Sequence, residues 1–219
     1  MNILIGIPTG NRHKQAVEVI KAWRDKGIDT AVITWDSPTD LASVLRIGVI
    51  CTPERQSFAY NHNRLAKATY ACCSWDAYIA GADDLWPGDF DLNLLMEYIK
   101  AYPDKILYVH DGCLSRCATH PVITRAWFES HNKTIYDEAY GHGWCDVDLT
   151  VTSAKENSIV KCFDIRFDHR HPMRNKAVEV DEIYKLGRKL TAEGTAYFQQ
   201  KFAGVDVETI IQNIEKGKL

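Results

Sequence analysis

The sequence predicts an α/β protein with a mostly parallel central sheet, flanking helices and a helical appendage at the C-terminus. Short apolar segments alternate with segments of helical period along most of the chain, which is the pattern of parallel crossover units. The 219 residues, 46% of them hydrophobic, suffice for one sizeable core. From about residue 178 the pattern becomes charged and helical, without a convincing linker. We therefore expect one domain over residues 1–177 and a helical extension over 178–219 packed on it.

The first crossover unit is predicted at the N-terminus. An apolar run at 2–7, followed by a proline and a glycine, predicts a strand that ends in a loop. Apolar residues then recur at helical spacing over 12–26 and a glycine follows, which predicts a helix and its end. A second apolar run at 30–34 completes a strand, a helix and a strand.

The later elements follow from the same two periods. Further strands are predicted at 45–51, 77–80, 105–110 and 159–167, further helices at 57–70, 90–100 and 145–156, and an irregular or helical piece at 122–130. In open α/β sheets, ligands bind outside the carboxyl ends of the strands. The loops expected at that edge read PTGNRH, TWDSPTD, TPERQS and GADDLWP, and all four are polar or charged.

Composition limits the classes of function. The formal net charge of −3 gives no general attraction to nucleic acid or to an anionic membrane. No segment approaches the ~20 apolar residues of a membrane span, and the N-terminus lacks the layout of a signal peptide. The seven cysteines are scattered, which suits reduced thiols better than a disulfide framework. These features predict a cytoplasmic protein.

The segment GADDLWP places two adjacent carboxylates, Asp83 and Asp84, directly after an apolar strand. Like charges repel, and their burial without partners is costly, so either a cation or an exposed loop must relieve them. Mg²⁺ and Mn²⁺ prefer carboxylate oxygens, and Mn²⁺ also accepts imidazole. A solvated turn that caps the following helix is the simpler alternative.

Five segments in order resemble the nucleotide-diphospho-sugar glycosyltransferases of the GT-A fold, especially the inverting enzymes of family 2. They are IGIPTGNR, VITWDSPTD, YIAGADDLWPGDF, TIYDEAYGHGWCDVDL and FDIRFDHRHP. Their order over residues 2–172 makes the resemblance fairly specific. It implies a GT-A, Rossmann-like fold and the inverting transfer of a sugar from a nucleotide diphosphate, most simply a UDP-sugar, to the hydroxyl of a glycan, small-molecule or modified-base acceptor.

The resemblance also implies roles for individual residues. Asp146 would be the catalytic base, since inversion needs a carboxylate on the acceptor side and a helix N-terminus favours its ionised form. Mn²⁺ or Mg²⁺ would be held by Asp83, Asp84 and His169. The donor would contact Pro8, Thr9, Asn11, Arg12, Asp36, Arg55, Asn63 and Asp83. The acceptor would contact Trp86, His142 and Trp144.

Two positions depart from the family pattern and leave alternatives open. Gly81 stands where the family has its first carboxylate, and Cys145 where it has the acidic residue before Asp146. We expect the loop to have re-formed around Gly81, because glycine allows close backbone approach. One alternative is a degenerate member that binds a sugar nucleotide or glycan without turnover. Another is a phage-type transferase acting on hydroxymethylated bases in DNA, which the net charge disfavours and the basic residues of 166–176 leave open.

Some of these side chains also have ordinary structural explanations. Asp36 could be a turn residue, and Asp146 could be the N-cap of the helix that follows it. Trp86 and Trp144 could be packed for their apolar area.

The histidines and cysteines are likewise ambiguous. His169 and His171 alternate on an expected strand, so only one should meet the cation and His171 should lie at the surface. Cys113, Cys117 and His120 resemble half of a zinc site, but without a clear fourth ligand we expect ordinary thiols there.

Overall fold

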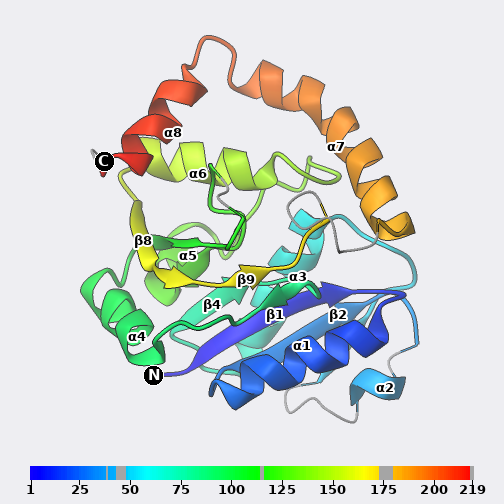
Figure 1. The fold of residues 1–219 in the computed structure, drawn as a ribbon. Coiled ribbons are helices and arrows are strands. Elements are labelled where there is room, and N and C mark those ends of the chain that lie inside the picture. The colour runs from blue at the N-terminus through cyan, green and yellow to red at the C-terminus, as the bar shows by residue number, and fades with distance from the viewer. Residues whose placement is uncertain (38, 43–47, 114–115, 173–179, 218–219) are drawn as a thin grey trace.

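The computed structural model describes residues 1–37, 39–42, 48–113, 116–172 and 180–217, and it confirms a mostly parallel sheet flanked by helices (Figure 1). Within these residues the central sheet has seven strands in the order β3-β2-β1-β4-β7-β6-β8. Their bounds are β1 Ile3–Thr9, β2 Asp29–Thr34, β3 Val49–Cys51, β4 Ala77–Ala80, β6 Ile106–His110, β7 Val122–Thr124 and β8 Ile159–Arg166. A second, antiparallel pair is formed by β5 Leu85–Trp86 and β9 Asp168–His169.

Strand direction decides which loops meet. β1 pairs in parallel with β2 and β4, and β2 pairs in parallel with β3. β7 runs antiparallel to both β4 and β6, whereas β6 and β8 are parallel. β6 therefore runs in the same direction as β4, and the carboxyl ends of β1, β2, β4 and β6 lie along one edge of the sheet.

Helices cover both faces of the sheet, because alternate side chains of a strand point to opposite faces. Ile3, Ile5 and Ile7 of β1 join one apolar cluster with α1 and α4, whereas Leu4 joins the other cluster with α3, α5 and α6. The bounds are α1 His13–Asp25, α2 Thr39–Ala42, α3 Phe58–Cys72, α4 Leu92–Ala101, α5 Arg125–Ser130 and α6 Cys145–Lys155.

The C-terminal helices α7 Glu182–Lys201 and α8 Val207–Glu215 pack on the same core. Phe198 of α7 and Phe202, which follows the helix, are buried, and Lys201 Nζ donates to Asp148 Oδ2 of α6 at 2.6 Å. In Figure 1, α7 runs from the region of the sheet edge toward α8, which lies beside α6. This placement brings the first half of α7 to the carboxyl edge of the sheet.

The predicted elements at 2–7, 12–26, 30–34, 57–70, 77–80, 90–100, 105–110, 145–156 and 159–167 are confirmed with shifts of a few residues at their ends. Of the strand predicted at 45–51, the structure describes only its end as β3, since residues 43–47 lie outside the described part. The piece at 122–130 is a three-residue strand followed by a short helix. A strand of this length is too short for its period to show in the sequence.

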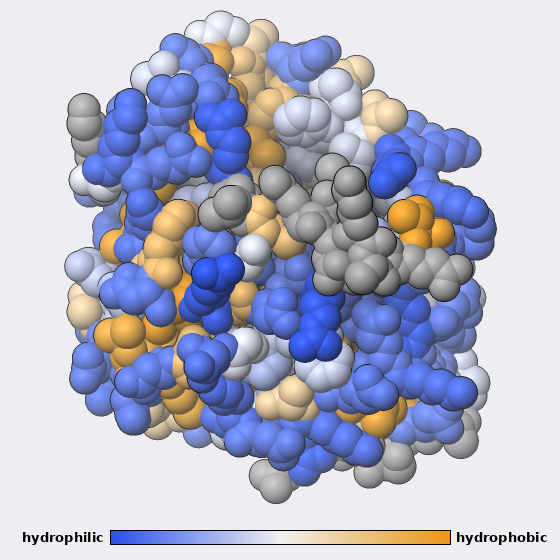
Figure 2. All heavy atoms as spheres, in the orientation of Figure 1, coloured by the Kyte–Doolittle hydropathy of each residue, from blue (hydrophilic) through white to orange (hydrophobic). Residues whose placement is uncertain are grey.

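No helix among the described residues combines the length and the apolarity needed to cross a membrane. Hydrophilic residues cover most of the face shown in Figure 2, interrupted by smaller hydrophobic areas.

Candidate functional site

A cavity of about 510 Å³ lies at the carboxyl edge of the sheet. Its walls come from the loops after β1, β2 and β4, from the start of α6, from the segment around β9 and from α7. The predicted site residues in its lining are Pro8, Thr9, Arg12, Arg55, Asp83, Asp84, His142, Asp146 and His169. The fold thus gathers residues that are up to 161 positions apart in the sequence, as Pro8 and His169 are.

Asp83 is buried and already has partners. Its carboxylate accepts a hydrogen bond from Thr9 Oγ1 at 2.7 Å and from Arg12 Nη1 at 3.1 Å. The same guanidinium makes two 2.7 Å bonds to Asp181, the N-cap of α7, and lies over the ring of Tyr184. Burial and the charge of Asp84 raise the pKa of Asp83, and Arg12 opposes this shift.

Asp84 faces the ring of His169. Its Oδ1 lies 3.5 Å from His169 Nε2, and its Oδ2 accepts from the Tyr184 hydroxyl at 2.8 Å. His169 Nδ1 lies 3.6 Å from Asp111 Oδ2. Burial alone would lower the pKa of His169, but the two flanking carboxylates raise it to about 12. Burial alone would raise the pKa of Asp84, but His169 and Tyr184 hold it well below its usual value.

These contacts leave the edge of the cavity rich in negative charge. Asp83 and Asp181 share the guanidinium of Arg12, and Asp84 and Asp111 share the imidazole of His169. Each pair of carboxylates therefore has one positive partner. Such an excess, held away from bulk water, attracts a cation.

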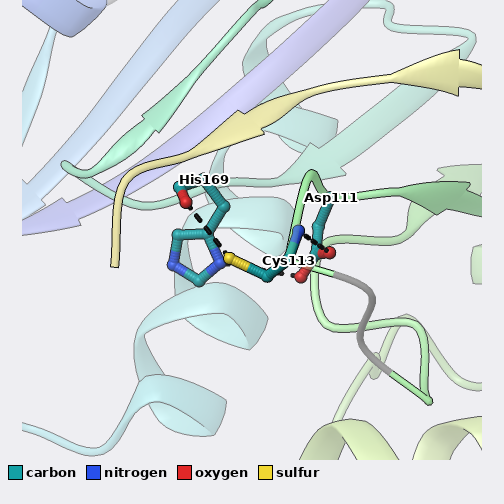
Figure 3. A group of neighbouring side chains, drawn as sticks. All are labelled: Asp111, Cys113 and His169. Carbon is teal, nitrogen blue, oxygen red and sulfur yellow. Dashed lines mark hydrogen bonds and ion pairs between the residues drawn. The ribbon is translucent and has the colours of Figure 1, made fainter. Parts of the chain in front are cut away.

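The group that best matches a metal site is Asp111, Cys113 and His169, whose potential ligand atoms all lie within 4.8 Å of one another (Figure 3). The predicted combination of Asp83, Asp84 and His169 is not gathered this closely among the described residues, because the Asp83 carboxylate faces Arg12. The sequence had pointed to Cys113 only together with a second cysteine. That cysteine, Cys117, instead donates to the Asp146 carboxylate at 3.3 Å.

Two further histidines line the cavity. His120 Nδ1 donates to the Ala80 carbonyl at 2.8 Å, and burial lowers its pKa to about 4, so the ring is neutral. His171 was expected to point away from His169, and this expectation is wrong. Residues two positions apart on an extended segment point to the same side, and the two rings lie 5.3 Å apart on the same cavity.

Gly81 occupies a position without room for a side chain. Its amide donates to the Gly6 carbonyl at 3.0 Å, and its own carbonyl accepts from His62 Nε2 at 3.0 Å. A Cβ atom here would lie 2.6 Å from side-chain atoms of Ile5 and 2.8 Å from the Gly6 oxygen. The backbone therefore continues the sheet where the family pattern places a carboxylate.

Asp36 organises the first two loops and is not part of the cavity lining. It accepts hydrogen bonds at 2.5 Å from the Asn11 backbone N–H, His13 Nε2 and Thr34 Oγ1. Asn11 is exposed and has a positive φ of 59°, which suits this turn. The neighbouring Trp35 does line the cavity. The guanidinium of Arg55 lies over its ring, 5.5 Å from the ring centroid.

Asn63 lies outside the cavity lining, with its amide fully used elsewhere. Its Oδ1 accepts from the Ile135 and Tyr136 backbone N–H groups at 2.8 and 3.0 Å. Its Nδ2 donates to the Tyr136 carbonyl and to Glu138 Oε1, both at 2.8 Å. Asn63 of α3, which was expected to contact the donor, therefore holds the loop before α6 in place.

Replacing Asn63 by aspartate should destabilise the protein by about 3 kcal/mol, because a buried carboxylate would face a carbonyl and another carboxylate in place of two donated hydrogen bonds. Urea unfolding measures the change. Asn157→Asp is the matched control: its side chain is exposed, so its stability should stay near that of the wild type. Equal stabilities of the two variants would contradict this structural role.

Asp146 lies in the first turn of α6 and lines the cavity. The N-cap of α6 is Trp144, in the left-handed region at φ 61°, so Asp146 is not the N-cap that the simpler explanation required. One Asp146 oxygen accepts from the Val147 backbone N–H at 2.9 Å and the other from Cys117 Sγ. Asp148 points elsewhere, to Lys201.

The two tryptophans are not part of the lining. Trp144 stacks on Phe198 with ring centroids 4.5 Å apart, and its Nε1 donates to Thr195 Oγ1 of α7 at 3.1 Å. Trp86 lies under the guanidinium of Arg170 at 4.1 Å. Both rings therefore contribute packing area, and of the expected acceptor residues only His142 reaches the cavity.

One wall of the cavity comes from a helix that no motif in the sequence connected with a function. The α7 residues in the lining are Ile183, Tyr184, Gly187, Arg188 and Thr191. Gly187 allows the helix to lie against the loop before α6, since a Cβ there would be 2.8 Å from His142 Nε2. An amphipathic pattern identifies such a helix but not the site that it covers.

No family model matches this chain, and no curated protein sequence matches it. Solved structures do resemble it. S. aureus TarS has a TM-score of 0.59 at 11% identity, covering 95% of this chain and 46% of TarS, so the chain spans about half the length of that protein. TarS 1–349 in complex with UDP-GlcNAc has a TM-score of 0.62 at 11% identity, and the match covers 98% of this chain and 72% of that one. A197 from STIV has a TM-score of 0.55 at 12% identity, and the match covers 80% of this chain and 92% of A197. These likenesses show a GT-A-like fold.

Proposed function

We propose that this protein is a glycosyltransferase that moves a sugar from a nucleotide diphosphate, most simply a UDP-sugar, to an acceptor hydroxyl with inversion. The observation that carries the proposal is the single cavity that brings the buried acidic pair Asp83–Asp84 together with Asp146. In a GT-A-like fold this cavity lies at the edge where parallel strands deliver ligand-binding loops. The TarS structure that holds UDP-GlcNAc supports a uridine nucleotide as the donor.

The donor's diphosphate would meet the positive side chains of the cavity. Arg12 is fixed by Asp83 and Asp181, and Arg55 has a buried Nη1 without a hydrogen-bond partner. An arginine fork matches phosphate oxygens in geometry and charge. Trp35 beside Arg55 offers an aromatic face to the nucleotide. Pro8 and Thr9 would form the adjoining wall, and Asp36 and Asn11 would shape it from outside.

A divalent cation fits the acidic side of the cavity. Asp84 and His169 offer a carboxylate oxygen and an imidazole nitrogen 3.5 Å apart, and Asp83, whose carboxylate faces Arg12, adds a second carboxylate to the same cavity. This donor set suits Mn²⁺ and, through its oxygens, Mg²⁺. When bound, the cation would neutralise the charge that develops on the leaving diphosphate.

Asp146 would act as the base. Its carboxylate takes the proton of the acceptor hydroxyl while that oxygen forms a bond to the anomeric carbon. The bond from the anomeric carbon to the diphosphate breaks on the opposite face, which inverts the configuration. The Val147 N–H and the Cys117 thiol hold the Asp146 carboxylate in place, and His142 would line the acceptor side.

Calorimetric titration with UDP tests the donor site. We expect Mn²⁺ to strengthen UDP binding to the wild type and Asp83→Ala to weaken it at least ~10-fold, since the carboxylate contributes to cation binding. Asp168→Ala is the control, because this half-exposed carboxylate contacts Arg170 outside the cavity. If the wild type and Asp83→Ala bind UDP with equal affinity, both with and without Mn²⁺, Asp83 does not hold the cation.

A further inference from the structure

We propose that Asp111, Cys113 and His169 form a binding site for one ion of the Zn²⁺ class, on the ring nitrogen of His169 that faces away from Asp84. This ion would be a second one, beside the cation proposed for the diphosphate, and would use His169 in place of that cation. The site depends on neither the donor nor the glycosyltransferase activity.

The spacing of the ligand atoms suits a tetrahedral ion. Asp111 Oδ2 and His169 Nδ1 lie 3.6 Å apart, and the Cys113 sulfur completes a group within 4.8 Å. Bonds of about 2.1 Å at a tetrahedral centre hold nitrogen and oxygen ligands roughly 3.4 Å apart. The atoms therefore stand close to ligating distance before any ion binds.

The backbone fixes this arrangement. Asp111 Oδ1 accepts from the Cys113 N–H at 2.9 Å, which leaves Oδ2 directed at His169. The His169 N–H donates to the Asp111 carbonyl at 3.0 Å, so the end of β6 is tied to β9. Gly112 between the two ligands has φ +83°, and a Cβ there would lie 2.8 Å from the Phe167 oxygen. Only glycine permits this tight turn.

Buried nitrogens without hydrogen-bond partners point to a missing ligand. His169 Nδ1 has the 3.6 Å ion pair with Asp111 but no hydrogen bond, and Nε2 of the adjacent His120, which is 3% exposed, has no hydrogen-bond partner. The two rings meet edge to face at 4.5 Å. Burial of polar nitrogens without hydrogen bonds is costly, and coordination would satisfy His169 Nδ1.

The ligand types select the ion. A thiolate with imidazole and carboxylate suits Zn²⁺, whereas Mg²⁺ and Mn²⁺ prefer oxygen ligands. With the ion on Nδ1, His169 would carry its proton on Nε2 and donate it to Asp84, so that Asp83 and Asp84 alone would supply the protein ligands of the diphosphate cation. The ion would thus connect β6 to β9 and orient a residue of the cavity.

Titration of the metal-free protein with Co²⁺, a spectroscopic substitute for Zn²⁺, tests the site in the absence of nucleotide. The assay is run in a Cys72→Ser/Cys73→Ser background, because these neighbouring thiols have sulfurs 3.3 Å apart and could bind metal themselves. We expect one equivalent of Co²⁺ to produce a thiolate-to-metal charge-transfer band that Zn²⁺ abolishes by displacement.

Cys113→Ser should remove this band, and Asp111→Asn should weaken binding about 100-fold. Cys162→Ser, which alters a buried cysteine outside the group, should change neither the band nor the affinity. The proposal is overturned if no saturable band appears in the parent protein, or if the band persists in Cys113→Ser. UDP binding with Mn²⁺ is measured on the same samples, so failure of the zinc site and failure of the donor site are told apart.

Discussion

Asp146→Asn is expected to lower the rate of sugar transfer by at least ~100-fold, with donor affinity and melting temperature almost unchanged. Asparagine keeps the shape of the side chain but cannot take a proton from the acceptor hydroxyl. Because the N-cap of α6 is Trp144, the substitution removes no cap. Release of UDP from a UDP-sugar, with an added acceptor or with water, measures the rate.

Asp148→Asn is the matched control on the same turn of α6. Asp148 is buried and paired with Lys201 rather than directed into the cavity. We expect this variant to lose stability while its folded fraction keeps the wild-type rate. Turnover near the wild-type level in Asp146→Asn would rule out Asp146 as the base.

Gly81→Asp, which restores the carboxylate of the family pattern, is expected to destabilise the protein by at least ~3 kcal/mol and not to tighten donor binding. The added Cβ would meet Ile5 and the Gly6 oxygen at distances that no relaxed structure shows. The new carboxylate would also be placed beside the buried Asp83 and Asp84. Urea unfolding and titration with UDP in the presence of Mn²⁺ measure both effects.

Gly81→Ala separates the steric effect from the charge. Because the clash begins at Cβ, alanine should already cause a large part of the loss, about 1–3 kcal/mol. If Gly81→Asp instead has a higher melting temperature and binds the donor more tightly, the missing carboxylate is a functional loss and the loop has not re-formed around glycine.

The parts of the fold that the sequence predicted are those with long, regular patterns. β1, α1 and β4 can be recognised from their local sequence alone, by its helical period or by its run of apolar residues. The antiparallel β7 was missed because its three residues are too few to show a period, and because strand direction depends on partners distant in the sequence.

The site was predictable where a residue follows directly from a strand or helix end, as for Asp83, Asp84 and Asp146. It was not predictable where the role depends on a partner far along the chain. Arg12 is fixed by Asp181, 169 positions away, and Asn63 is used by a loop more than 70 positions away. No local pattern encodes such pairings.

The same limit explains the candidate zinc site. Asp111 and Cys113 stand two residues apart, but their third ligand, His169, arrives only because β9 is placed beside the end of β6. The sequence therefore suggested the nearer combination with Cys117, whose thiol the fold directs to Asp146.

The most direct test of the proposed glycosyltransferase site is the shift in melting temperature caused by nucleotide sugars in the presence of Mn²⁺. A ligand that binds only the folded state stabilises it by about 2.7 kcal/mol at 100 times its Kd. We expect UDP and at least one UDP-sugar to raise the melting temperature clearly, and uridine, which lacks the diphosphate, to leave it unchanged. If no nucleoside diphosphate or nucleotide sugar shifts it at millimolar concentration, the cavity is not a nucleotide-sugar site.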